Sequence, residues 1–126
     1  MQPVNLFSLA TRQAEWLSAR QAAVAGNIAN VNTPGYRAVD VETFDKVLDR
    51  TGVSLTATQQ GHFGLGAEQA SFKLRDDDRS TAVLPSNNTV VLEQELMKGG
   101  EVARSFELNT AIVKAFHRMM LMSARG

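Results

Sequence analysis

The chain has 126 residues, a formal net charge of zero at pH 7 and no cysteine, and aromatic residues make up only 6% of it. This length predicts a single domain, and with so few aromatic residues a compact core would depend on Leu, Val, Ala and Met. The balanced charge argues against electrostatic binding of nucleic acid, and the lack of cysteine excludes disulfides and thiolate metal sites.

The sequence shows no targeting or membrane-spanning segment. Residues 1–5 lack the basic start and continuous apolar core of a secretory signal. No apolar run approaches the roughly 20 residues needed to cross a bilayer, and no cluster of Lys and Arg suggests an anionic membrane surface. We therefore expect a cytoplasmic protein, or one that leaves the cytoplasm by a route without a cleaved signal.

The first predicted element is one amphipathic helix over about residues 5–30. Its apolar face is formed by residues at helical spacing, namely Leu6, Ala10, Leu17, Val24, Ile28 and Val31. The same face carries three polar residues spaced by seven: Gln13, Arg20 and Asn27. In coiled coils, polar residues at such positions weaken packing but specify register and oligomeric state. An equally weighted alternative is a narrower apolar face with these three residues at its edge.

Dense turn chemistry follows this helix. Thr33 precedes a proline and is therefore disfavoured in helical conformation, so the helix should end at or before it. Pro34 suits the second position of a β-turn, and Gly35 can take the positive φ that the third position of a type II turn requires. Asn27 and Asn30 are poor helix-interior residues because their amides compete for backbone groups. Local chemistry alone favours a helix terminus over an assembly motif.

The middle of the chain is predicted to be less regular. Asp40 can cap a short helix over about residues 41–50, and Gly52 is a natural stop. Residues 53–88 contain short apolar runs between glycines and an acidic turn. They are expected to form either a small hairpin with its turn near Asp77 or a mobile loop.

The last predicted element is a helix over about residues 89–124. Its stripe repeats with spacings of four and three through Val102, Phe106, Asn109, Val113, Phe116 and Met120. Gly99 and Gly100 interrupt it, and two glycines cost about 2 kcal/mol relative to alanine in a helix interior. We expect a kink or break at this pair.

The predicted fold is therefore mainly α, with long terminal amphipathic helices that pair as a coiled coil around an irregular middle. Its three parts are the N-terminal helix (1–33), the turn, short helix and irregular segment (34–88), and the C-terminal helix (89–126). Two such stripes can bury each other but cannot build a thick core. Leftover apolar surface suggests that the helices also meet neighbouring subunits.

No group of residues has the spacing of a catalytic or metal site. His62 and His117 lie far apart on different kinds of segment, without ligand-like spacing to carboxylates. The run from Asp76 to Asp78 lacks the alternating ligands and glycine of a calcium loop, so we expect a solvated turn. We predict a protein without cofactors and without enzymatic activity.

The turn region resembles the N-terminal signature of the rod family of the bacterial flagellar basal body. The matching positions are Asn27, Asn30, Asn32, Thr33, Pro34, Gly35 and Tyr36. The residues that follow, 37–40 and Phe44, are similar to the small proximal rod proteins of the B type. Residues 88–96 resemble the start of that family's C-terminal helix, although Val91 stands where the family usually has Asp.

This resemblance implies a structural subunit that is exported by the flagellar type III system and polymerises into a periplasmic drive shaft for motility. Its partners would be other rod proteins, the rod adaptor protein, and the export gate or base ring, with no nucleic acid and no membrane span. Helix–helix and subunit contacts are expected at Leu6, Gln13, Leu17, Arg20, Val24, Ile28, Val102, Phe106, Asn109, Val113, Phe116 and Met120. The competing hypothesis is a cytoplasmic helical adaptor or secretion chaperone that binds a partner helix.

Overall fold

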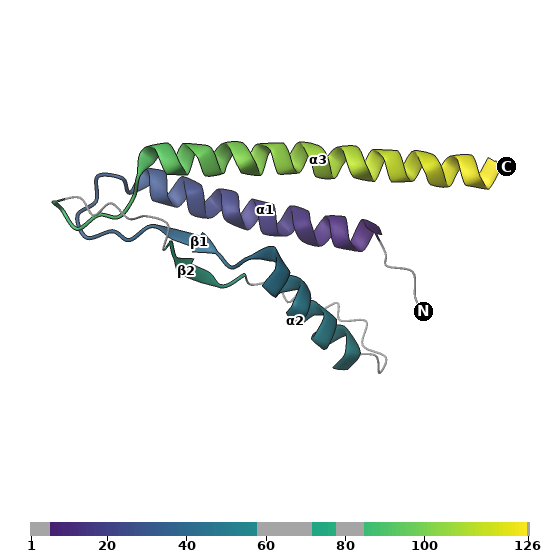
Figure 1. Cartoon of the computed structure of the whole chain (residues 1–126), viewed down its shortest axis with the longest axis horizontal. Coiled ribbons are helices and arrows are strands. Elements are labelled where there is room, and N and C mark those ends of the chain that lie inside the picture. Colours follow the sequence, from purple (N-terminus) through teal and green to yellow (C-terminus); the bar gives the residue numbers. More distant parts are fainter. Residues whose placement is uncertain (1–5, 58–71, 78–84, 126) are drawn as a thin grey trace.

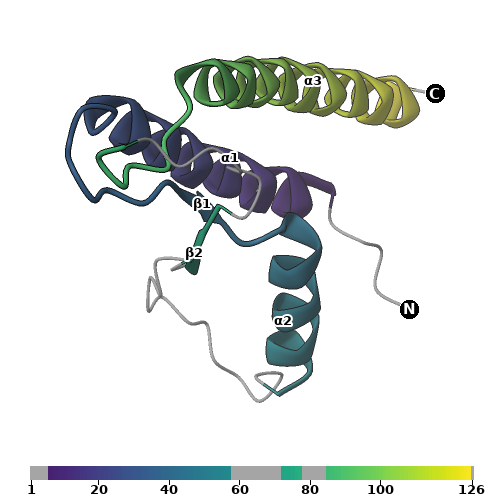
Figure 2. The same cartoon turned by 60° about the vertical axis from the view of Figure 1, so that its left-hand side comes forward.

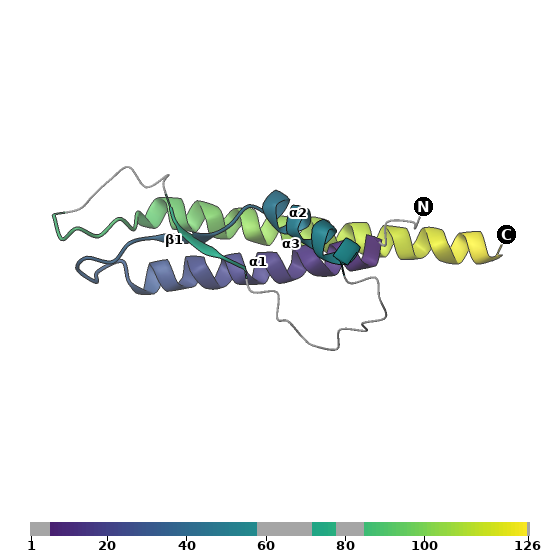
Figure 3. The same ribbon diagram turned by 90° about the horizontal axis from the view of Figure 1, so that it is seen from below.

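Two long helices form the frame of the molecule and lie side by side in opposite directions (Figure 1). The computed structural model describes residues 6–57, 72–77 and 85–125. Helix α1 spans Leu6–Ala29 and helix α3 spans Leu92–Arg125. The predicted mainly helical fold, with long terminal helices that pack together, is confirmed. Figure 3 shows that α3 runs past the N-terminal end of α1.

Helix α3 passes through Gly99 and Gly100 without interruption, so the predicted break there is wrong. A Cβ built on Gly99 would lie 4.0 Å from Cγ1 of Val24 on α1, which shows that the helices pack closely at this point. Val102, one turn later, is only 2% exposed. Packing against α1 outweighs the local cost of two glycines, because most helical stability in proteins comes from tertiary contacts.

A two-stranded antiparallel sheet lies beside α1. Strand β1 spans Val39–Val41 and pairs with strand β2, Leu74–Asp76, so that Asp40 is opposite Arg75. The small sheet expected in the middle of the chain is thus present, but β2 pairs with a strand that precedes α2. The predicted hairpin with its turn near Asp77 would extend into residues 78–84, which lie outside the described residues.

Helix α2 spans Phe44–Ala57 and projects away from the two long helices (Figure 2). Its predicted start after Asp40 and its predicted end at Gly52 are both wrong. Asp40 belongs to β1, where its Oδ1 accepts a hydrogen bond from the Val41 N–H at 2.8 Å instead of capping a helix. The helix also continues through residues 53–57, which the sequence pattern assigned to the irregular segment.

The core is thin and lies mainly between α1, α3 and β1. Its buried apolar residues are mostly small: Ala10, Leu17, Ala23, Val24, Ala38, Val41, Val47, Val90 and Val102. Polar side chains are buried beside them, namely Asn27, Asp40, Glu42, Asn88, Glu95, Lys98 and Asn109. Hydrogen bonds and ion pairs therefore contribute to how the elements are held together. Among the described helices, none combines the length and the apolar character needed to cross a membrane.

Candidate functional site

The turn that follows α1 has the backbone geometry expected from its sequence. The Tyr36 N–H donates to the Thr33 carbonyl at 3.2 Å, which closes a four-residue β-turn around Pro34. Gly35 has a φ of +76°, close to the value required at the third position of a type II turn. The Gly35 N–H donates to the Ser86 carbonyl at 2.9 Å, so the turn is also tied to the segment that leads into α3.

Asn27 joins α1, β1 and α3 through one fully buried amide. Its Oδ1 accepts from the Val39 N–H at 3.0 Å and its Nδ2 donates to the Val39 carbonyl at 2.8 Å. The same Nδ2 donates to Oε2 of Glu95 on α3 at 3.0 Å, and the Tyr36 hydroxyl lies 3.4 Å from Oδ1. An amide offers two donors and two acceptor sites, and all four are in use. Asn27 thereby binds the edge of β1 that β2 leaves open.

The C-terminal end of α1 is closed by two further asparagines. Asn30 Nδ2 donates to the Gly26 carbonyl at 2.8 Å, and its Oδ1 accepts from the Thr33 hydroxyl at 3.1 Å. Asn88, which precedes α3, is fully buried, and its Nδ2 lies 2.9, 3.0 and 2.8 Å from the carbonyl oxygens of Asn30, Val31 and Thr33. Asn30 thus binds a carbonyl of the last turn of α1, and Asn88 binds carbonyls of the turn that follows the helix. Asn88 was not among the predicted site residues, although the family-like segment 88–96 begins with it.

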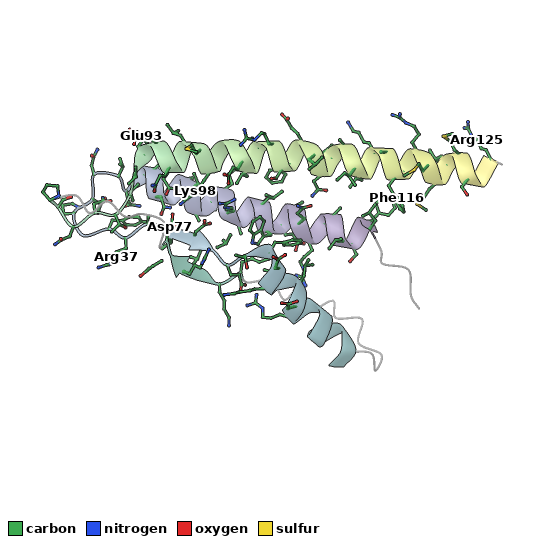
Figure 4. All side chains as sticks on the ribbon, in the orientation of Figure 1. Arg37, Asp77, Glu93, Lys98, Phe116 and Arg125 are labelled. Carbon is green, nitrogen blue, oxygen red and sulfur yellow. The ribbon has the colours of Figure 1, made fainter. Side chains whose placement is uncertain are left out.

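A buried ion cluster lies where α3 meets the end of β2. Lys98 Nζ donates to Oε1 of Glu95 at 2.8 Å and also pairs with Oδ2 of Asp77. Figure 4 shows Lys98 and Asp77 between α3 and the sheet. The side chains of Lys98, Glu95 and Asp77 are 7%, 1% and 4% exposed. The expectation of a solvated acidic turn is therefore wrong for Asp77, because Lys98 reaches its carboxylate from α3.

The ion cluster changes the titration of its lysine. Burial by itself lowers the pKa of Lys98, because it removes the ammonium group from water. The hydrogen bonds that Lys98 donates to Asp77 and Glu95 act in the opposite direction and prevail, so its pKa lies above the ordinary value. Lys98 is therefore held in its charged form.

A second set of polar contacts joins α1 to β1, to the residue after β1 and to α3. Arg20 pairs with the Asp40 carboxylate at 3.3 Å and with Glu101 of α3 at 3.4 Å, and its guanidinium lies 5.7 Å from the centre of the Trp16 ring. Trp16 Nε1 donates to the Glu42 carbonyl at 2.7 Å. Of the three polar residues at seven-residue spacing, Arg20 and Asn27 bind other elements of the same chain. The third, Gln13, is half-buried.

Glu42 anchors α2 through its carboxylate. Arg50 Nη1 donates to Oε2 at 2.8 Å, Arg50 Nη2 pairs with Oε1, and the Lys73 N–H donates to Oε1 at 3.2 Å. Burial alone raises the pKa of Glu42, but these bonds outweigh it and lower the pKa below the ordinary value. Glu42 therefore connects α2 to the residue that leads into β2.

The predicted helix stripes contact each other along α1 and α3. Asn109 Nδ2 donates to the Ala10 carbonyl at 2.9 Å, and the rings of Phe7 and Phe116 meet edge-on with centroids 5.3 Å apart. Leu17, Val24 and Val102 are buried, whereas Leu6, Ile28, Phe106 and Val113 are half-buried. Met120 lies beyond this contact and is 51% exposed.

The helix pair leaves much apolar surface exposed on α3. The large exposed side chains are Leu92, Leu96, Met97, Leu108, Ile112, Met119, Met120, Leu121 and Met122. Within residues 6–57, 72–77 and 85–125, no group of three His, Cys, Asp or Glu side chains could hold a metal ion. His62 lies outside this part of the chain, and His117 is exposed on α3. The arrangement offers surfaces for protein contacts.

Comparison with known proteins gives two matches. The model of the family described as flagella basal body rod protein matches residues 16–37. This segment holds Trp16, Arg20 and Asn27, whose side chains bind β1 and the residue after it, and it ends just past the turn. The flagellar basal body rod protein FlgB of Agrobacterium fabrum is 44% identical over 129 residues, which cover 99% of this chain and 96% of that protein.

Proposed function

The chain belongs to the family of flagellar basal body rod proteins and is a structural component of the rod. We propose that it is a subunit of the proximal rod. In this proposal the flagellar type III system exports it, and it polymerises with other rod proteins into the periplasmic drive shaft that motility requires. The lack of cysteine is compatible with passage in an unfolded state, since no disulfide has to be avoided or broken.

One observation carries the proposal of polymerisation. The two terminal helices bury one stripe against each other, yet Leu108, Met119 and Met122 on α3 remain 62%, 59% and 67% exposed. Exposed apolar patches of this kind mark interaction sites in soluble proteins. A rod subunit would bury this surface against its neighbours on assembly.

The partners proposed are other rod proteins, the rod adaptor protein, and the export gate or base ring below. The helix pair would form part of the inner wall of the rod, with the turn at Pro34 and Gly35 directing the chain outward to β1 and α2. Asn27 supports this role for the turn, because its amide fixes Val39 of β1 shortly after the turn at residues 33–36.

Fractionation of cells tests the proposal against the alternative of a cytoplasmic adaptor or secretion chaperone. A strain that lacks the gene and carries a tagged copy should regain motility, and the tagged chain should co-purify with basal bodies. A tagged chain that restores motility but stays in the soluble fraction would favour the adaptor. A matched strain with a disabled export apparatus should retain the chain inside the cell.

A further inference from the structure

Helix α3 carries a second apolar stripe outside its contact with α1. This outer stripe consists of Leu108, Ile112, Ala115, Met119 and Met122, spaced by four and three, and all five residues are exposed. Its first four members directly precede Asn109, Val113, Phe116 and Met120 of the stripe predicted from sequence, so the two stripes lie about 100° apart around the helix. A helix with two such stripes can contact two other helices at once. In the described part of the chain, α1 covers only one of them.

Charge is segregated along the same helix. The exposed cations Lys114, Arg118 and Arg125 lie in the C-terminal half, where residues 108–125 include no carboxylate. The exposed carboxylates lie in the N-terminal half, at Glu93, Glu101 and Glu107, together with the cation Arg104. Figure 4 shows Glu93 and Arg125 at opposite ends of α3. The two halves of the helix are therefore opposite in net charge.

The acidic half also has an exposed apolar surface of its own. Leu92, Leu96 and Met97 are 42%, 60% and 68% exposed. Each half of α3 thus combines exposed apolar side chains with charges of one predominant sign. The N-terminal half of α3 therefore complements the C-terminal half, because both have exposed apolar side chains and their net charges are opposite.

We propose that the C-terminal half of α3 in one copy docks on the N-terminal half of α3 in a second copy of this chain. The outer stripe packs on the apolar residues of the acidic half, with cations beside carboxylates. Like charges disfavour contact between two C-terminal halves, so charge selects the pairing of unlike halves. This inference rests on the proposed function and deepens it, because it names the surfaces on which copies meet.

When the two helices run parallel, this contact offsets the two copies by about half the length of α3, roughly 25 Å at 1.5 Å per residue. Each copy has one half of each kind, so the contact is of the type that can repeat from copy to copy. A repeating contact is what a polymer needs, whereas a contact between identical halves would stop at a pair.

Charge reversal in the purified full-length chain tests the proposal by sedimentation velocity. The wild-type chain should self-associate, and added salt should weaken the association. Arg125→Glu and Glu107→Arg, at positions that this offset brings side by side, should each raise the dissociation constant by about tenfold. An equimolar mixture of the two variants, or one chain with both changes, should regain most of the lost affinity. Lys46→Glu on α2, with the same change in charge as Arg125→Glu, should leave association unchanged.

All of these substituted residues are exposed, so circular dichroism should show unchanged helicity in each variant. The proposal is overturned if the wild-type chain stays monomeric, or if the doubly changed chain associates no better than either single variant. It is also overturned if a photo-crosslinking residue at position 119 in intact basal bodies yields adducts with other proteins only. Those results leave the proposed function standing, since that fails only if the chain is absent from basal bodies.

Discussion

The side chain of Asn27 pairs with the backbone of Val39 as a neighbouring strand would, accepting from its N–H at 3.0 Å and donating to its carbonyl at 2.8 Å. One helical residue therefore takes the place of a third strand beside β1. The same amide also donates to Glu95, so one buried side chain near the end of α1 is hydrogen-bonded to both the sheet and α3.

Asn27→Ala should reduce the free energy of unfolding by about 3 kcal/mol, because it removes the hydrogen bonds to the N–H and carbonyl of Val39 and to Oε2 of Glu95. Urea denaturation of the purified chain measures this. Asn32→Ala, at an exposed position of the same turn, is the matched control and should stay within about 0.5 kcal/mol of wild type. Equal effects of the two substitutions would contradict the role given to Asn27.

Lys98→Met should destabilise the fold by about 3–5 kcal/mol, since it leaves two buried carboxylates without their counter-ion. The loss should be smaller in acidic buffer than at neutral pH, because the penalty falls on unpaired negative charge. Lys114→Met, at an exposed position of the same helix, should change stability by no more than about 0.5 kcal/mol. A loss that does not vary between neutral and acidic buffer would show that the charges of the cluster are not its cause.

Stability should fall on both sides of a plateau in pH. The lowered pKa of Glu42 gives stability that is present above its unfolded-state value, about 4.5, and is lost as the pH falls through the folded-state pKa. The raised pKa of Lys98 gives stability that is present below 10.5 and is lost as the pH rises through its folded-state pKa. Urea midpoints measured against pH should therefore decline less steeply on the acid side in Glu42→Gln than in wild type. Identical acid slopes would rule out Glu42 as a contributor.

Gly35→Val should impair assembly of the rod more than expression or export. Apart from Gly35 itself and its two chain neighbours, no described atom lies within 4 Å of a Cβ built on Gly35, so the cost comes from the positive φ, which a β-branched residue adopts only with strain. Gly35→Asn is the control, because asparagine tolerates this conformation better. Swimming in soft agar and the amount of chain in purified basal bodies report the effect, and unchanged motility in Gly35→Val would refute it.

In the isolated protein, the backbone amides near the N-terminus of α1 and the C-terminus of α3 should be less protected from hydrogen exchange than those near the turn at residues 33–36. Amide hydrogen exchange should be slow near Asn27, Glu95 and Val102, which are buried, and fast at Met119–Met122, where α3 has run past α1. A cooperative monomer in which these two helix ends are as protected as the amides near the turn would contradict this expectation.

The features predicted correctly from sequence are those with a local cause. Apolar spacing located α1 and α3 because a helix repeats its face every 3.6 residues, a signal that needs no knowledge of the partner. The positive φ at Gly35 followed from its place after Pro34, since turn geometry is decided within four residues.

The features that were missed depend on contacts distant in the chain. Strands β1 and β2 each have three residues, too few to show a period, and their pairing joins segments on either side of α2. Asp77 was expected to be solvated because its partner, Lys98, is distant in the sequence and reaches it from α3. Gly99 looked like a helix breaker for the same reason, because Val24 packs against it from α1.

The antiparallel arrangement of α1 and α3 also sets an order of events in time. The bond between Asn27 and Glu95 spans 68 positions of the chain, and the bond between Ala10 and Asn109 spans 99. If the proposed export delivers the chain N-terminus first through a narrow passage, neither contact can close until most of the chain has emerged. In that case its early portion has no helix to pair with during transit, and the subunit can fold only at the point of release.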